Sequence, residues 1–228
     1  MSDQRLRELE RRYRESGSPT DQAEWLLERV RVGDLEPSRL SAAARSGHPG
    51  AVLAVPAAEV ERAAAKAAAY VAGMYPAGVD RAASSWVFSL MECGRRVFTR
   101  ALFEAVRTLG GTALPARDGG IFAEVVSDIE SLLSAKGDSR SEQLQRVLDR
   151  LHVLRAERPG HDVAFGIAER LVCAMADSAP DLYYRRDLNA ALEELDSLVN
   201  AVPASVAAMR LSLASWCLGE PQSGVTRP

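Results

Sequence analysis

The chain has 228 residues, of which 47% are hydrophobic and 26% are charged, a composition typical of a folded globular protein that excludes wholesale disorder. Its length allows one large domain or two small ones. The formal net charge is −3, and neither half of the chain concentrates the basic residues that binding to a phosphate backbone requires, so nucleic-acid binding is disfavoured.

Apolar residues recur at spacings of three and four along most of the chain, and glycine and proline bracket the segments that carry this pattern. The spacing is that of a helix with one buried face. Aromatic residues make up only 6% of the chain and alanine is abundant, which also favours helix over strand. The sequence therefore predicts an all-α protein of about ten helices, arranged as a helical bundle or a short α-solenoid-like array.

The N-terminal part of the chain is expected to begin with five helices. Their approximate ranges are residues 3–15, 19–32, 37–45, 49–55 and 56–73. Ser18 suits the position that caps the second helix, Pro19 suits its first turn, and Gly33 suits a left-handed residue at its end. Gly47 and His48 supply the turn between the two short helices.

Residues 79–109 are predicted to form a long central helix, because the segment carries two apolar stripes and needs neighbours on both sides. Gly94 interrupts it and allows a bend or a close crossing. Residues 110–120 read GGTALPARDGG, which is typical of a linker or loop. We expect an N-terminal subdomain over 1–112, a glycine-rich linker or loop over 113–120, a C-terminal subdomain over 121–220 and a disordered tail over 221–228.

The C-terminal subdomain is predicted to hold five further helices. They are expected at 121–135, from Ser139 through Leu154, at 161–177, at 181–202 and at 203–218. Ser139 and Glu142 have the spacing of a capping box. Glu193, Glu194 and Asp196 lie on the polar side of a clear apolar stripe, so a solvated face is expected for them.

Cys93, Cys173 and Cys217 are odd in number and far apart, so no disulfide framework is indicated and buried positions are expected for all three. No apolar run reaches the ~18–20 residues that span a bilayer, and the chain opens on a charged stretch rather than on an apolar signal core. We therefore expect a cytoplasmic protein without a membrane partner.

Two stretches resemble known helical proteins. Residues 39–53 read RLSAAARSGHPGAVL, and Ala43-Ala44-Arg45 followed by Gly47-His48 resembles the helix–turn–helix of one ankyrin repeat. The first quarter, from Arg5-Leu6-Arg7-Glu8 through Gly47-His48-Pro49, resembles the start of a group of uncharacterised bacterial α-helical proteins. This second resemblance implies a helical fold and a bacterial source but no activity.

Candidate chemistry is sparse, and no glycine-rich phosphate loop is present. His152 and His161-Asp162, followed by Asp181 or Asp187, resemble the order of metal ligands in HD-domain phosphohydrolases, which are all-helical. That resemblance implies a divalent metal held by imidazoles and carboxylates. The alternative is that His161 or Asp162 begins a helix and complements its dipole.

The leading hypothesis is a non-enzymatic protein-interaction module that needs no cofactor: an adaptor, a scaffold or an immunity-type partner. Tyr183-Tyr184-Arg185-Arg186 has the composition of a partner contact, and a homo-oligomer is also possible. One alternative is the metal-dependent phosphohydrolase with His152, His161 and Asp162. Another is a small-ligand-binding helical bundle with a pocket near Trp86 and Gly94.

Overall fold

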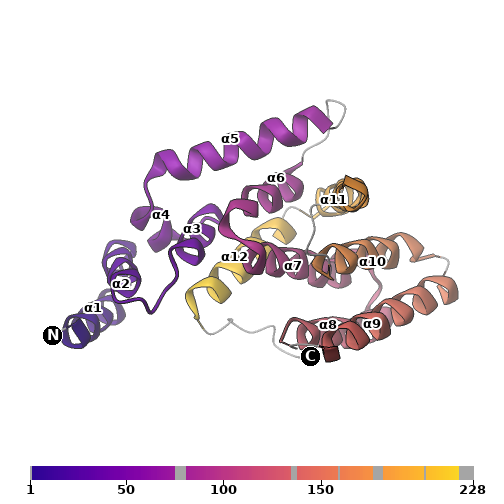
Figure 1. Ribbon diagram of the computed structural model, residues 1–228, viewed down its shortest axis with the longest axis horizontal. Helices are drawn as coiled ribbons and strands as arrows, with labels where there is room; N and C mark the ends of the chain where they lie inside the picture. Colours follow the sequence, from indigo (N-terminus) through magenta and orange to yellow (C-terminus); the bar gives the residue numbers. More distant parts are fainter. Residues whose placement is uncertain are drawn as a thin grey trace. The chain divides into compact units, whose positions relative to one another are not determined.

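The computed structural model describes residues 2–74, 81–134, 138–158, 160–176, 182–202 and 204–220 (Figure 1). Within these ranges the chain forms twelve α-helices and one short 3₁₀ turn, with no β-strand, so the predicted all-α class is confirmed. The helices are α1 (Ser2–Ser16), α2 (Pro19–Arg31), α3 (Pro37–Arg45), α4 (Pro49–Ala54), α5 (Ala57–Met74), α6 (Ala82–Ser89), α7 (Arg95–Ala113), α8 (Ala116–Ser134), α9 (Asp138–Glu157), α10 (Asp162–Ala176), α11 (Leu182–Val199) and α12 (Ala204–Leu218).

The chain folds into two compact units that do not follow the expected division at residues 113–120. Unit 1 comprises, among the described residues, 2–74, 85–98 and 210–220. Unit 2 comprises 81–84 and the described part of 99–209. The boundary between the units falls within α6, α7 and α12. The tail at 221–228 lies outside the described residues.

The linker or loop expected at residues 113–120 is helical over most of its length. Gly110 and Gly111 lie inside α7, and Gly119 and Gly120 lie inside α8, so the two helices are separated by residues 114 and 115 only. A Cβ atom built on Gly110 would lie 2.6 Å from Cδ1 of Phe122, so this glycine leaves room for the Phe122 ring of α8 against α7. The position of the Phe122 ring therefore explains one of the glycines that the sequence pattern assigned to a loop.

The predicted helix over 79–109 is also wrong, because the described residues divide it into two helices. α6 ends at Ser89, Met91–Cys93 form the 3₁₀ turn, and α7 begins at Arg95. Gly94 has a φ of +93°, a left-handed value that side-chain-bearing residues rarely adopt and that a continuous helix excludes. Gly94 was recognised as an interruption, but it breaks the helix rather than bending it.

Unit 1 is built from short helices that follow one another closely. α2 packs against α1 and α4, and α3 packs against α4 and α5. The predicted local signals are confirmed: the Ser18 hydroxyl accepts the N–H of Thr20 at 3.2 Å, and Gly33 and Gly47 have φ values of +82° and +83°. Leu26, with no exposed surface, lies in the core of this unit.

Unit 2 contains four consecutive helices, α8 to α11, each of which packs against the next (Figure 1). The rings of Phe122 and Phe165 have centroids 5.7 Å apart and are both almost fully buried. The apolar stripes predicted for this part of the chain form the core, with Ile129, Leu151 and Leu192 fully buried. Burial of such faces is the main source of helix stability in proteins.

Candidate functional site

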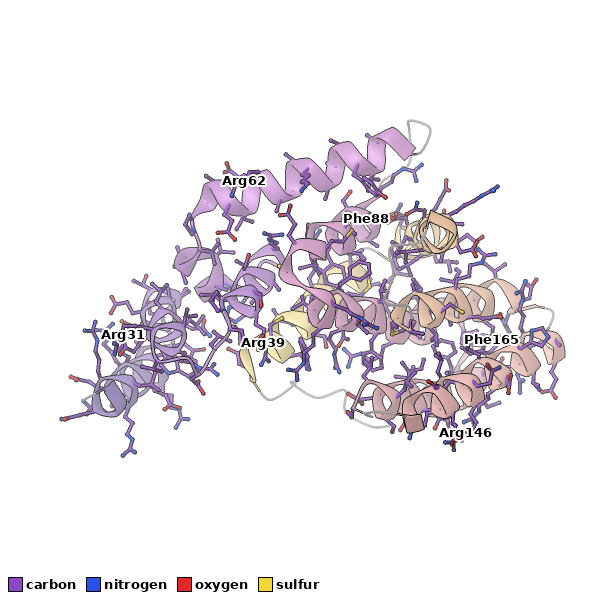
Figure 2. The ribbon with its side chains drawn as sticks, viewed as in Figure 1. Arg31, Arg39, Arg62, Phe88, Arg146 and Phe165 are labelled. Carbon is purple, nitrogen blue, oxygen red and sulfur yellow. The ribbon has the colours of Figure 1, made fainter. Side chains whose placement is uncertain are left out.

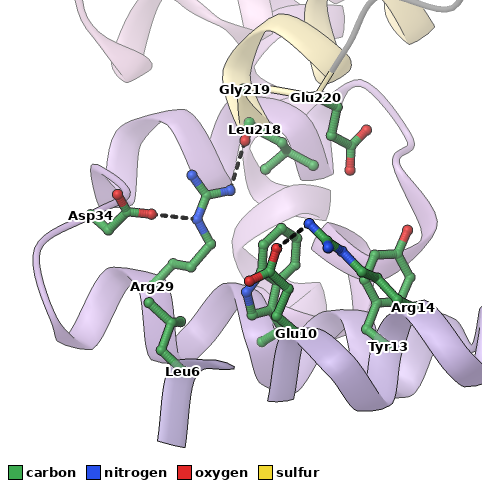
Figure 3. Close-up of a pocket in the computed structure, with 10 residues that line it drawn as sticks. Leu6, Glu10, Tyr13, Arg14, Arg29, Asp34, Leu218, Gly219 and Glu220 are labelled. Carbon is green, nitrogen blue, oxygen red and sulfur yellow. Dashed lines mark hydrogen bonds and ion pairs between the residues drawn. The ribbon is translucent and has the colours of Figure 1, made fainter. Parts of the chain in front are cut away.

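A pocket of about 540 Å³ lies in unit 1, between α1, α2 and the C-terminal end of α12 (Figure 3). We call it the unit 1 pocket. Its lining brings together residues from both ends of the described chain. These residues are Leu6, Glu10, Tyr13, Arg14, Trp25, Arg29, Asp34, Leu218, Gly219 and Glu220.

Two aromatic rings form one wall of the unit 1 pocket. Tyr13 of α1 and Trp25 of α2 are stacked, with ring centroids 5.6 Å apart and an interplanar angle of 19°. The guanidinium carbon of Arg29 lies 4.9 Å from the centroid of the Trp25 ring, within the distance of a cation–π interaction. Both rings are partly exposed, so they present aromatic surface to the pocket.

Arg29 is fixed by two further contacts. Its Nε donates to Oδ2 of Asp34 at 2.6 Å, and its Nη1 donates to the carbonyl oxygen of Leu218 at 2.7 Å (Figure 3). Leu218 is the last residue of α12, so the guanidinium satisfies a helix-end carbonyl and complements the negative end of the helix dipole. Arg29 therefore ties the end of α12 to α2.

Glu220 is the second tie between α12 and the first helices. Its Oε1 accepts a hydrogen bond from Nε2 of Gln22 at 3.0 Å and lies 3.5 Å from Nε2 of His48. His48 caps α4, because its Nδ1 accepts the N–H of Ala51 at 3.3 Å, and a neutral ring then carries its hydrogen on Nε2. Gly50 leaves room for Gln22, since a built Cβ would lie 2.6 Å from Oε1 of Gln22.

The electrostatics of the unit 1 pocket are mixed. Its lining contains three carboxylates and two guanidinium groups, and Arg14 donates to Glu10 at 2.6 Å. Burial raises the pKa of the Tyr13 hydroxyl, and the negative charge of Glu220 raises it further. The pocket can therefore hold a polar or charged group against an aromatic surface.

The histidines of the expected metal site are not brought together. His152 is exposed on α9, whereas Nε2 of His161 lies 3.3 Å from Oδ2 of Asp118, and Oδ1 of Asp118 accepts a hydrogen bond from Nε of Arg158 at 3.3 Å. Asp162 is exposed in the first turn of α10. Across the described ranges, no group of three or more His, Cys, Asp or Glu side chains is arranged to hold a metal ion.

The capping alternative fits this region of unit 2. The carbonyl oxygen of His161 accepts the N–H of Phe165 at 3.2 Å, and α10 begins at Asp162. Asp118 lies in the first turn of α8 and holds both His161 and Arg158. The cluster joins the start of α8 to the segment that leads into α10.

The other residues singled out from the sequence have different outcomes. Tyr183, Tyr184 and Arg185 lie in the first turn of α11, but their side chains are outside the described part of the structure; Arg186 is exposed. Trp86 is buried and its indole N–H donates to Ser46 at 3.2 Å, and neither it nor Gly94 lines the unit 1 pocket. Cys93 and Cys217 are buried as expected, whereas Cys173 is partly exposed.

One acidic residue was misplaced by the sequence pattern. Glu193 and Glu194 are partly exposed and lie near Arg81 and Arg170, but Asp196 has no exposed surface. Its carboxylate accepts the N–H groups of Ala83 and Ser84 and so caps α6. The expected solvated face is therefore wrong for Asp196.

Comparison of the chain with protein-family models, with curated proteins and with solved structures found no match. Among the described residues, no single helix has the length and apolarity needed to cross a membrane, and only the bent pair of 186–199 with 204–218 meets the length and composition criteria when taken together.

The unit 1 pocket was missed by the sequence analysis. The sequence around Trp25 indicates only a helix, and nothing local connects this residue with Leu218 or Glu220, which are almost two hundred residues away. The one available signal was composition: tryptophan, tyrosine and arginine together are enriched where proteins contact each other.

Proposed function

We propose that this protein is a non-enzymatic protein-interaction module, in which the unit 1 pocket receives a side chain of a protein partner. The observation that supports this most directly is the placement of Arg29 and Tyr13 around Trp25 in the wall of a pocket. Tryptophan, tyrosine and arginine are the residues that contribute most to binding energy at protein interfaces. An adaptor, a scaffold or an immunity-type partner would use such a site.

The wall of the pocket is held in place before any partner binds. Arg29 is fixed by Asp34 and by the Leu218 carbonyl, and the Tyr13 ring is fixed by its stacking on Trp25. Side chains that are already ordered lose little conformational entropy on association, which otherwise costs about 0.5–1.5 kcal/mol for each immobilised side chain. Preorganisation therefore supports a binding role for this pocket.

Site-specific photo-crosslinking in the native host tests the proposal. A photo-crosslinking amino acid is placed at Arg14, which is exposed and lines the pocket, and at Arg11, which is exposed on the same helix but does not line it. The expected result is one crosslinked protein from position 14 that is absent from position 11. Identical products from both positions would argue against the pocket as the contact.

Substitution within the pocket provides the second part of this test. Trp25→Ala is expected to abolish the crosslink from position 14, whereas Leu27→Ala, at an exposed position on the same helix, is expected to retain it. Circular dichroism of both variants separates loss of binding from loss of folding. A folded Trp25→Ala variant that crosslinks as well as the parent protein would contradict the proposal.

The volume of the pocket favours a second candidate, a small-ligand-binding helical bundle. A volume of about 540 Å³ falls within the range of about 300–1,000 Å³ that small-molecule sites occupy. Native mass spectrometry of the purified protein distinguishes the two: a bound small molecule that is lost in Trp25→Ala would favour the ligand, and its absence together with a position 14 crosslink would favour the partner protein.

A further inference from the structure

We infer that Arg39 and Arg96, which both lie over the ring of Trp216 in unit 1, bind carboxylate groups of an acidic segment of a protein partner. We call these residues the arginine pair. The inference rests on the proposed function, because it names the chemistry of the partner that unit 1 would bind. It uses a different surface from the unit 1 pocket, since none of the three residues lines that pocket.

The geometry of the arginine pair is set by three separate helices. The guanidinium carbons of Arg39, from α3, and Arg96, from the first turn of α7, lie 4.9 Å and 5.7 Å from the centroid of the Trp216 ring of α12. Nη2 of Arg39 also donates to the carbonyl oxygen of Trp216 (Figure 2 shows Arg39 beside α12). Both cations are within the distance of about 6 Å at which an aromatic ring attracts them.

The charges of the arginine pair are not neutralised within the part of the chain that the structure describes. Neither Arg39 nor Arg96 has a carboxylate within ion-pair distance, and Nε of Arg39 has no hydrogen-bond acceptor. Other arginines of unit 1 do have such partners: Arg12, Arg14, Arg29 and Arg45. Arg96 is exposed, so an anion can approach it from solvent, whereas Arg39 is partly exposed and its Nε is buried.

Two guanidinium groups that share one ring repel each other, and a bound carboxylate relieves that repulsion. The guanidinium group is planar, with donors spaced to match the two oxygens of a carboxylate, so the recognition is specific as well as attractive. Charge-assisted hydrogen bonds of this kind are stronger than neutral ones.

An acidic protein segment suits this surface better than a nucleic acid does. Nucleic-acid affinity comes from many phosphate contacts made together, and the arginine pair supplies only two cations in a chain whose net charge is −3. Aspartate or glutamate side chains on a partner can be bound through the one or two such contacts that the arginine pair supplies.

Fluorescence anisotropy with defined peptides tests the inference. The probe is a fluorescein-labelled peptide of four Glu-Gly repeats, and its matched control has glutamine in place of each glutamate. The parent protein is expected to bind the glutamate peptide at least about tenfold more tightly than the glutamine peptide, because each charged hydrogen bond contributes more than a neutral one. Raising the salt concentration to about 1 M is expected to weaken binding, because it shortens the screening length.

Variants assign the binding to these two residues. Arg96→Gln is expected to weaken binding of the glutamate peptide about tenfold. Arg62→Gln removes an equal charge from the exposed side of α5 in the same unit (Figure 2) and is expected to change affinity less than twofold. Arg39→Lys keeps the charge but loses the planar fork, so it is expected to bind more weakly than the parent protein. Thermal unfolding of each variant shows whether the Arg39 contact to α12 is needed for folding.

Several outcomes would overturn the inference. They are equal binding of the glutamate and glutamine peptides, unchanged affinity in a folded Arg96→Gln variant, or tighter binding of a single-stranded oligonucleotide than of the glutamate peptide. Any of these together with a crosslink from position 14 removes the acidic-partner inference and leaves the proposed function in place. Glutamate-peptide binding that depends on the arginine pair, without that crosslink, supports the inference and argues against the unit 1 pocket as the partner contact.

Discussion

The carboxylate of Asp196 on α11 caps the first turn of α6 through Ser84, a residue 112 positions earlier in the chain. Its Oδ1 accepts the N–H of Ala83 at 2.8 Å and the N–H of Ser84 at 3.2 Å, and its Oδ2 accepts the Ser84 hydroxyl. All of these groups belong to unit 2. A distant side chain thus accepts two of the N–H groups that a helix start leaves without an intrahelical acceptor.

Replacement of Asp196 is expected to destabilise the protein. Asp196→Ala leaves buried N–H groups without an acceptor, which costs about 1–3 kcal/mol of unfolding free energy, whereas Asp196→Asn keeps one carbonyl acceptor and is expected to cost less. Urea unfolding monitored by circular dichroism measures both. Asp187→Ala, at an exposed position on the same helix, is the control; a cost as large as that of Asp196→Ala would show that the cap is unimportant.

Protonation of Asp196 should make the unfolding free energy depend on pH. Burial raises its pKa above the ordinary 3.8, although hydrogen bonds from Ser84 and Ala83 oppose the shift. The folded state therefore holds the proton more tightly than the unfolded chain does. The contribution of Asp196 to the unfolding free energy consequently decreases as pH rises from about 3.8 through the raised pKa. The unfolding free energy of the parent protein minus that of Asp196→Asn should therefore decrease as pH rises. A difference that is constant with pH would contradict the raised pKa.

Gly110 and Gly111 should respond oppositely to alanine. Alanine is normally favoured over glycine inside a helix by about 0.8–1.0 kcal/mol. At Gly111 a Cβ meets nothing within 4 Å, so Gly111→Ala should raise the unfolding free energy towards that amount. At Gly110 the Cβ would lie 2.6 Å from the Phe122 ring, so Gly110→Ala should lower it. Thermal unfolding of the Gly110→Ala and Gly111→Ala variants tests this prediction. Equal effects of the two substitutions would mean that the Phe122 contact is not tight.

The three cysteines should react with a thiol reagent at different rates. Cys173 is partly exposed, whereas Cys93 and Cys217 are buried. Burial also raises the pKa of the Cys93 thiol, which lowers the fraction of reactive thiolate. One fast equivalent is expected under native conditions and should disappear in Cys173→Ser, while all three thiols react in denaturant. A fast phase that persists in Cys173→Ser would contradict the burial of the other two.

Helix positions were predictable because their signals are local. Ser18 and Pro19 mark the start of α2, and Gly33 and Gly47 mark turns by the positive φ that they adopt. Periodic leucines and valines likewise predicted the buried faces of α10 and α11. These features depend on neighbouring residues, which the sequence shows directly.

The predictions that were wrong concern features that do not depend on neighbouring residues. Gly110 looks like a loop residue until Phe122 is known to pack on the helix, and Asp196 looks solvated until the start of α6 is placed against it. The unit 1 pocket needs Leu6 and Glu220 in one place. Each depends on contacts between residues far apart in the sequence, which periodicity and capping rules do not contain.

The hydrogen bonds between α12 and the first helices can form only after most of the chain has been synthesised. Gln22 and Glu220, which are hydrogen-bonded, are separated by 198 positions, and Arg29 and Leu218 by 189. During synthesis the ribosome must therefore add Glu220 before α1 to α4 can acquire this part of their surroundings. Until then Trp25 and its neighbours lack α12 beside them, so this aromatic surface is more exposed in the nascent chain than in the folded protein.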